Sequence, residues 1–114
     1  MRHTEALVGN VLTVVLDGPL EEGGAAELLP VIEDALESDR TRFVLDLSRV
    51  PYADSVGLEV LVKIASRVFR FGGRLGLFGA TEHLAEILRV TRLEQRLATF
   101  QSREEALARV RGGD

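Results

Sequence analysis

The chain lacks cysteine throughout its 114 residues, which excludes disulfide bonds, thiolate metal sites and cysteine nucleophiles. The same absence fits a reducing compartment. Tryptophan is also missing and aromatic residues make up only 5% of the chain, which argues against an aromatic platform for single-stranded nucleic acid. Any chemistry must therefore come from hydroxyl, carboxylate, imidazole or cationic side chains.

Basic charge is also scarce. The 18 acidic residues outnumber the 14 basic ones, for a net charge of −4, so a broad basic surface for nucleic acid is not expected. Charged residues interrupt the apolar runs well before the roughly 20 residues that a membrane span needs. The N-terminal stretch lacks the apolar core of a signal peptide. We expect a cytoplasmic protein with no membrane span and no nucleic-acid partner.

The length fits one domain, residues 1–114, with one hydrophobic core. Residues 7–8 and 11–16 are rich in strand-forming side chains. They flank Gly9-Asn10, a dipeptide that tolerates positive φ, and therefore predict an antiparallel hairpin.

The rest of the chain alternates between strand and helix patterns. The predicted strands are 42–47, 75–78 and a short one within 96–100, and the predicted helices are 25–38, 56–71, 81–90 and 102–111. Pro30 either delays the start of the first helix or kinks it. This alternation implies right-handed βαβ crossovers. We predict one α/β domain with a mostly parallel sheet of four to five strands, the N-terminal hairpin, about four helices and a frayed tail at about 111–114.

The junction before the second predicted helix places Asp54 and Ser55 side by side. A Ser or Asp at such a position is commonly an N-cap, whose side-chain oxygen accepts a backbone N–H. A helix N-terminus also accommodates an anion, so a phosphate on Ser55 would not unfold the helix. Gly57, one turn in, removes a side chain that would crowd such a site. We expect both Asp54 and Ser55 to cap the helix.

Placed about 100° apart on a helical wheel, residues 56–71 separate into a polar and an apolar side. The polar stripe consists of Glu59, Lys63, Ser66, Arg67 and Arg70, and the core-facing side consists of Leu61, Ile64, Ala65 and Val68. Val56 falls within the polar stripe, and Val60 lies at its margin. We expect Val56 to be largely exposed and to contact a partner.

A small serine hydrolase is a remote alternative. The sequence "ADSVG" is one residue away from the G-x-S-x-G turn of α/β-hydrolases, with Ala53 in place of the first glycine. The serine would need a histidine base, and the chain offers only His3 and His83. No acidic or histidine cluster has metal-ligand spacing. We therefore predict no catalytic residue, no metal site and no cofactor.

The segment "FVLDLSRVPYADSVGLEVL", residues 43–61, resembles the central signature of the STAS family, the anti-sigma factor antagonists of bacterial partner-switching systems. In that signature a strand ends in Asp-Leu-Ser, and Asp-Ser-x-Gly-Leu opens a helix after a short link. "LDGPLEEGGAAELL", residues 16–29, is similar to the family's Gly-x-Leu stretch, and residues 72–107 follow the family's usual ending. The resemblance covers nearly the whole chain.

The resemblance implies that Ser55 is phosphorylated by a protein kinase that is itself the anti-sigma factor and has a histidine-kinase-like ATPase fold. The unphosphorylated chain would bind this kinase, the phosphorylated chain would release it, and a phosphatase would reset the cycle. The chain would then be a substrate and not an enzyme. Val56 departs from the family pattern, which often has Ser or Thr there. The alternative is a STAS subunit that is not phosphorylated, within a lipid transporter or a stress-signalling assembly.

The partner surface that this interpretation predicts extends from the Gly-x-Leu stretch to the second helix. It consists of Glu21, Asp54, Ser55, Val56, Gly57, Glu59, Val60 and Lys63. The unpaired edge of the predicted hairpin would allow weak self-association. We therefore expect a monomer or a weak homodimer.

Overall fold

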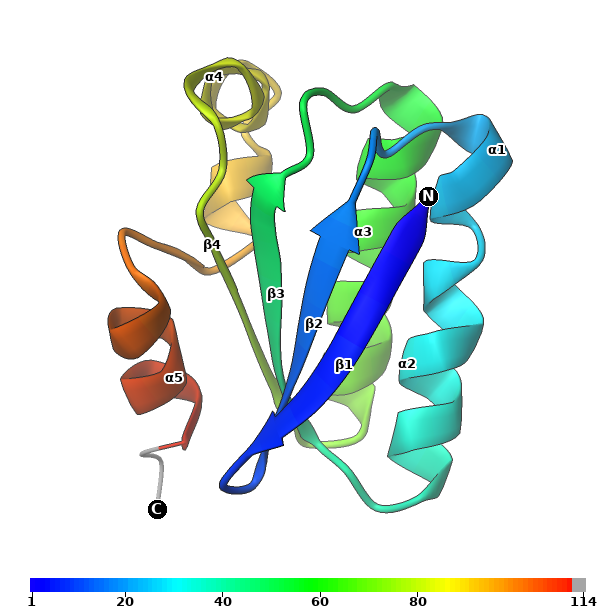
Figure 1. Ribbon diagram of the computed structural model, residues 1–114, viewed down its shortest axis with the longest axis vertical. Helices are drawn as coiled ribbons and strands as arrows, with labels where there is room; N and C mark the ends of the chain where they lie inside the picture. Colours follow the sequence, from blue (N-terminus) through cyan, green and yellow to red (C-terminus); the bar gives the residue numbers. More distant parts are fainter. Residues whose placement is uncertain (112–114) are drawn as a thin grey trace.

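A computed structural model describes residues 1–111 (Figure 1). Its elements in chain order are β1 (Arg2–Val8), β2 (Val11–Asp17), α1 (Glu22–Ala25), α2 (Leu28–Glu37), β3 (Arg42–Arg49), α3 (Ser55–Arg70), β4 (Arg74–Phe78), α4 (Glu82–Val90), the 3₁₀ turn η1 (Leu93–Gln95), β5 (Thr99–Phe100) and α5 (Arg103–Arg111). The frayed tail predicted at about 111–114 lies outside the described residues except for Arg111, which ends α5.

The five strands form one sheet in the order β1-β2-β3-β4-β5. β1 and β2 pair antiparallel around the turn at Gly9, whose φ of +62° matches the predicted hairpin. The other neighbours pair parallel. The predicted α/β architecture is confirmed. β1 begins at Arg2, earlier than the sequence indicated, because its mostly exposed side chains carry no apolar alternation.

The sheet is covered on both faces (Figure 1). Helices α1, α2 and α3 lie on one face and α5 lies on the other, while α4 lies beyond the upper end of β4. The larger core fills the space under α2 and α3 and includes Leu16, Leu45 and Ile64. A smaller core under α5 includes Val44 and Leu107. Strands β2 and β3 are buried on both faces, which explains their nearly continuous apolar sequences.

Pro30 is the third residue of α2. In the first turn of a helix the N–H groups have no partner within the helix, so proline costs little there. The sequence left open whether Pro30 delays the start of the helix or kinks it, and the structure answers this question. The long predicted helix starts late, after the separate turn of α1, and it is not kinked at Pro30.

The sequence also indicates caps for two other helices, with Thr81 placed as an N-cap and Ser102 and Glu105 at capping-box spacing. The Thr81 hydroxyl accepts from Leu84 N at 3.2 Å and caps α4. The Ser102 hydroxyl accepts from Glu105 N at 3.1 Å, and the Glu105 carboxylate accepts from Gln101 N at 2.9 Å. Ser102 therefore caps α5 as in a capping box, but the Glu105 carboxylate accepts from the residue before the cap and not from Ser102 N. Over the described part of the chain, no helix has the length and apolarity to cross a membrane.

Candidate functional site at the start of the third helix

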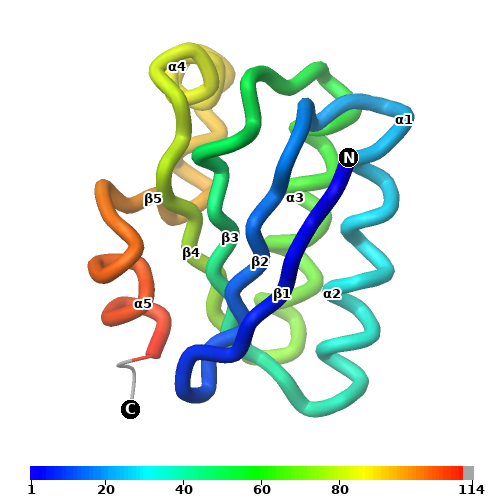
Figure 2. Tube along the Cα trace, in the orientation of Figure 1, coloured from blue at the N-terminus to red at the C-terminus, as the bar shows by residue number. Residues whose placement is uncertain are grey.

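Two loops come together at the carboxyl ends of β2 and β3, where they rise side by side (Figure 2). Leu20 N donates to Tyr52 O at 3.0 Å, and Asp54 N donates to Leu20 O at 3.0 Å. A parallel bridge between Leu20 and Ala53 extends the pairing of the strands into these loops. The buried Leu20 and Val50 side chains anchor the loops in the core. The start of α3 is therefore held in place by the loop that leads into α1.

Asp54 is the N-cap of α3. Its Oδ1 atom accepts from Gly57 N at 2.8 Å, and its Oδ2 atom accepts from Glu22 N at 3.3 Å. One carboxylate thus satisfies backbone donors at the starts of both α1 and α3.

Ser55 does not share the cap, so the sequence prediction was wrong on this point. Ser55 is the first residue of α3, and a cap oxygen must come from the residue before the helix. Its side chain is exposed, and its hydroxyl makes no hydrogen bond to any residue between 1 and 111. The carboxylate next to it does the capping and leaves this hydroxyl free to react.

Gly57 supports the packing of α3 on the neighbouring loop. A Cβ atom at this position would lie 2.0 Å from Leu20 O and 2.5 Å from the carbonyl carbon, which is an impossible approach. The sequence predicted that Gly57 leaves room around Ser55, and this prediction was incomplete. Glycine is needed because the first turn of α3 lies against the backbone of the preceding loop.

Tyr52 belongs to this site, although the sequence interpretation missed it. Its hydroxyl donates to Glu21 Oε1 at 2.9 Å, and its side chain is 42% exposed. The hydrogen bond to Glu21 and the negative charge of that carboxylate raise the pKa of Tyr52 above its usual value, with a smaller contribution from Asp54. The sequence did offer a signal for this residue, because Tyr52 is the only tyrosine of the chain and lies in the short link just before Asp54.

The two valines of the predicted surface are more buried than expected. Val56 is half-buried and not largely exposed, and Val60 is only 7% exposed and belongs to the main core. The physical reason is that α3 packs against α1 and α2 as well as against the sheet. A helical wheel describes one helix alone and does not report how many neighbours cover it.

The polar stripe of α3 divides into an available part and an occupied part. Glu59 and Lys63 are exposed and form an i,i+4 ion pair at 3.9 Å, which contributes about 0.3–0.5 kcal/mol at most. Arg67 is paired with Glu33 of α2 through its guanidinium group. The available surface therefore runs from Ser55 to Lys63 and ends where Arg67 fastens the two helices together.

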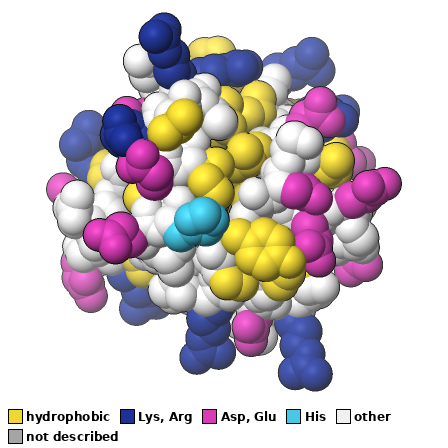
Figure 3. All heavy atoms as spheres, turned by 90° about the horizontal axis from the view of Figure 1, so that it is seen from above, with side chains coloured by type: hydrophobic (Ala, Val, Ile, Leu, Met, Phe, Trp, Pro, Cys, Tyr) yellow, Lys and Arg dark blue, Asp and Glu magenta, His cyan; other side chains and the backbone are white. Residues whose placement is uncertain are grey.

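The upper end of the molecule is acidic on the side of α1 (Figure 3). The acidic residues joined to the start of α3 by the hydrogen bonds described above are Asp54, Glu22 through its backbone N–H, and Glu21 through Tyr52. Figure 3 also shows hydrophobic surface and one histidine near the middle of this face. The face therefore combines an exposed hydroxyl with an acidic border and an apolar centre.

Neither histidine is a base for Ser55 within the described residues. His3 lies in β1 and contacts Glu5 at 3.2 Å, and His83 lies in α4. The described residues also contain no group of three or more acidic or histidine side chains that would hold a metal ion. The arrangement around Ser55 offers an acceptor hydroxyl and lacks the partners that a nucleophilic serine requires.

The hairpin, the parallel strands and the joined loops that present α3 define a small α/β domain with a mixed five-stranded sheet. The family model described as STAS domain matches residues 6–106. This match spans most of the chain, and the chain belongs to the STAS domain family.

Three similar proteins illustrate the family. BtrV of Bordetella bronchiseptica, named as a candidate anti-sigma factor antagonist, is 27% identical over 108 residues, which cover 95% of this chain and 93% of BtrV. The crystal structure of TM1081 from Thermotoga maritima, named in the same way, has a TM-score of 0.89 at 24% identity and covers 96% of this chain and 94% of TM1081. The phosphorylated form of SpoIIAA from Bacillus has a TM-score of 0.72 at 18% identity, over 96% and 99% of the two chains. The two solved structures share the fold of this chain.

Proposed function

We propose that this chain is an anti-sigma factor antagonist whose binding is controlled at Ser55. The unphosphorylated form binds an anti-sigma factor that is also a serine kinase of the histidine-kinase-like ATPase fold, and phosphorylation of Ser55 releases it. A phosphatase restores the binding form. The observation that carries the proposal is the exposed Ser55 hydroxyl at the start of α3, which has no hydrogen bond to another described residue. The names of BtrV and TM1081 support the same role.

The start of α3 tolerates a phosphate without loss of the fold. The cap oxygen of Asp54 engages Gly57 N, whereas the N–H groups of Ser55 and Val56 precede the first intrahelical acceptor. A phosphate on Ser55 would lie at the positive end of the helix dipole, where an anion is stabilised. The modified chain should therefore keep its structure while its surface changes.

The phosphate changes the partner surface through charge. It adds nearly two negative charges to a surface already bordered by Glu21, Glu22 and Asp54. A partner that fits the unmodified hydroxyl would have to desolvate this dianion on binding, which is costly without a cationic group opposite it. The acidic border therefore favours release of the phosphorylated form.

The predicted partner residues have different parts in this surface. Asp54, Ser55, Glu59 and Lys63 are exposed and are proposed to contact the partner, with half-buried Glu21 and Val56 at the border. Gly57 and Val60 are buried and keep the shape of the surface. We add Tyr52 to the contact set, because its ring is partly exposed and its hydroxyl is fixed by Glu21.

Intact-mass measurement tests the acceptor. The purified chain is incubated with ATP and the anti-sigma kinase encoded nearest to it. The wild-type chain is expected to gain one phosphate and Ser55→Ala none. Ser66→Ala, which removes another exposed hydroxyl of α3, is the matched control and should still be modified. Peptide mapping that places the phosphate on Ser48, Ser66 or Ser102 would contradict the assignment.

Binding measurements separate this proposal from a constitutively bound STAS subunit. Ser55→Asp should lose binding to the kinase, and Ser55→Ala should bind and stay bound when ATP is added. Circular dichroism of both variants checks that the fold persists. If wild type, Ser55→Ala and Ser55→Asp all bind alike with and without ATP, the switch is refuted and the constitutive subunit is the better description.

A further inference from the structure

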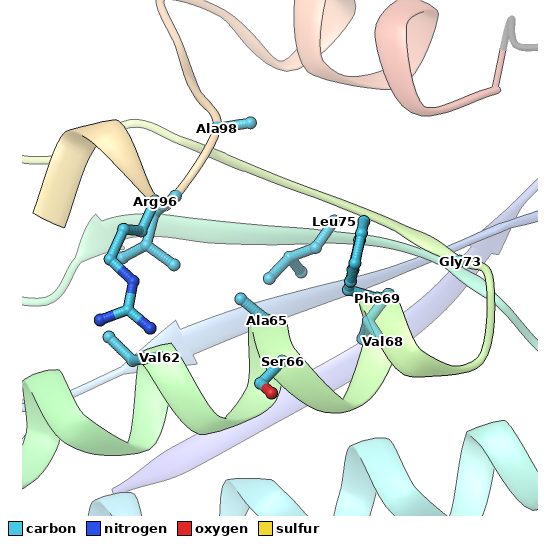
Figure 4. Close-up of a pocket in the computed structure, with 10 residues that line it drawn as sticks. Val62, Ala65, Ser66, Val68, Phe69, Gly73, Leu75, Arg96 and Ala98 are labelled. Carbon is cyan, nitrogen blue, oxygen red and sulfur yellow. The ribbon is translucent and has the colours of Figure 1, made fainter.

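A groove lies along the flank of α3, below the Ser55 surface and away from α1. It has a volume of about 350 Å³, which is within the range of small-ligand sites. Val62, Ala65 and Phe69 of α3 form one wall, and Leu75 of β4 forms the floor (Figure 4). The segment with Arg96 and Ala98, between η1 and β5, forms the other wall.

The course of the chain explains why this space is open. After β4 the chain rises to α4 at the upper end of the sheet, and it returns through η1 to the short strand β5 (Figure 1). The lower part of β4 is therefore covered on this face only by the flank of α3. Leu75 stays half-buried, and the ring of Phe69 is 82% exposed. An exposed aromatic ring beside an apolar groove is typical of a binding surface.

The groove is lined mainly by apolar side chains, with Ser66 also on its border and the cation of Arg96 at one end. Figure 4 shows the guanidinium group of Arg96 extending toward Val62, at the end of the groove opposite Phe69. This guanidinium makes no ion pair or hydrogen bond with another residue of the described chain. Val62 and Phe69 lie seven positions apart along α3, which corresponds to about 10 Å. An unpaired cation in a protein of net charge −4 offers charge complementarity to an anionic head group.

We propose that this groove binds an anionic amphiphile of medium chain length, of the fatty-carboxylate class. The carboxylate pairs with the planar guanidinium of Arg96, for which a bidentate geometry is available. The acyl chain follows the flank of α3 over Leu75 and ends against Phe69. Burial of the chain removes both the floor of the groove and the Phe69 ring from water.

Titration of the isotope-labelled full chain with decanoate, below its micelle concentration, tests the proposal by NMR. Backbone amide shifts should be confined to the groove, including Ala65, Leu75 and Ala98. Hexanoate and octanoate should bind more weakly, by about fourfold in Kd for each methylene group not buried. A decyl trimethylammonium cation of equal chain length is the charge control and should not bind at this site. Equal binding of the cation, or a Kd independent of chain length, would overturn the proposal.

Two variants locate the head group and the chain. Arg96→Gln should weaken decanoate binding at least tenfold, as expected for the loss of a charge-assisted hydrogen bond. Arg103→Gln, at an exposed arginine outside the groove, should bind as wild type does. Ala65→Phe, on the wall formed by α3, should fill the groove and abolish binding, and circular dichroism should show that the protein stays folded. Shifts that lie elsewhere on the protein, or an Arg96→Gln variant with wild-type affinity, would refute the site. The test does not involve Ser55, so its outcome is independent of the proposed switch.

Discussion

At both ends of α3 a glycine allows close packing against a backbone carbonyl, but the side chains around the two ends are covered to different degrees. At the upper end, Gly57 lets the helix approach Leu20 O, and at the lower end Gly73 lets the following turn approach Thr41 O. A Cβ atom would lie 2.0 Å from the first carbonyl oxygen and 2.2 Å from the second. At the upper end the backbone N–H groups of Gly57 and Glu22 donate to the Asp54 carboxylate, whereas the lower end leaves Phe69 82% exposed and Phe71 55% exposed.

This difference separates two kinds of surface on a single helix. Around the upper end, Asp54 and Glu21 are engaged in hydrogen bonds, whereas the Ser55 hydroxyl makes none to another described residue. Around the lower end Phe69 and Phe71 lack a cover, and the cation of Arg96 lies at the far end of the adjoining groove, near Val62. The first surface suits a partner whose binding is lost when negative charge is added at Ser55. The second surface suits a ligand with an apolar chain that can cover the exposed side chains.

The largest expected effect comes from the two glycines. Gly57→Ala and Gly73→Ala should each lower the free energy of unfolding by about 3 kcal/mol or more, because the new Cβ must displace a backbone carbonyl. Urea denaturation followed by circular dichroism measures the loss. Gly23→Ala is the matched control, since a Cβ there meets no atom within 4 Å. Its stability should stay within about 1 kcal/mol of wild type or rise.

The glycine pair also tests whether the ends have separate functions. In the folded fraction, Gly57→Ala should slow phosphorylation of Ser55, because the first turn of α3 is displaced. Gly73→Ala should leave the phosphorylation rate per folded molecule unchanged. Equal rates for the two variants would show that the upper end does not depend on this packing.

The next effect concerns the cap. Asp54→Ala removes the acceptor of Gly57 N and of Glu22 N, and it should cost about 1–2 kcal/mol of stability. Asp54→Asn keeps an acceptor oxygen and should cost less, since Asn and Asp are similarly good caps. Thr81→Ala, which removes the cap of α4, is the control and should cost about 1 kcal/mol without affecting partner binding. An Asp54→Ala variant as stable as wild type would contradict the role of the carboxylate.

The sequence was sufficient for those features that depend on neighbouring residues. The hairpin at Gly9-Asn10, the caps at Thr81 and Ser102 and the order of strands and helices follow from local patterns, and the structure confirms them. Features that depend on two distant segments were missed or misread. The bond from Glu22 N to Asp54 joins residues 32 positions apart, and the cover over Val56 comes from packing between helices. Neither contact leaves a periodic signal in the chain.

A smaller effect is expected for Ser55→Ala. Because Asp54 alone caps α3 and the Ser55 hydroxyl has no hydrogen bond within the described chain, the change should alter stability by less than about 0.5 kcal/mol. The sequence alone would have assigned a loss of about 1 kcal/mol for a missing cap. Paired urea curves for Ser55→Ala and Asp54→Ala measure the contrast. If Ser55→Ala lowered the free energy of unfolding as much as Asp54→Ala does, Ser55 would also contribute to the cap, as the sequence predicted.

The smallest effect is a shift in the titration of Tyr52. This residue is the only tyrosine, and the chain has no tryptophan, so ultraviolet absorbance follows its ionisation alone. The hydrogen bond to Glu21 and the adjacent negative charge favour the neutral phenol, which raises the pKa of Tyr52 in the folded chain above its value in the unfolded chain, about 10. The resulting stability is complete below pH 10 and is lost as the pH rises through the raised folded pKa.

Glu21→Gln should therefore lower the titration midpoint of Tyr52 toward that of a free tyrosine, because the carboxylate charge is lost while an amide oxygen still accepts a hydrogen bond. Glu59→Gln removes an exposed acid that makes no contact with Tyr52 in the described chain, and it should leave the midpoint unchanged. Circular dichroism over the same pH range confirms that the fold persists. If wild type and Glu21→Gln titrate alike, then the negative charge of Glu21 does not act on Tyr52 in solution, and the carboxylate lies farther from the phenol than their hydrogen bond indicates.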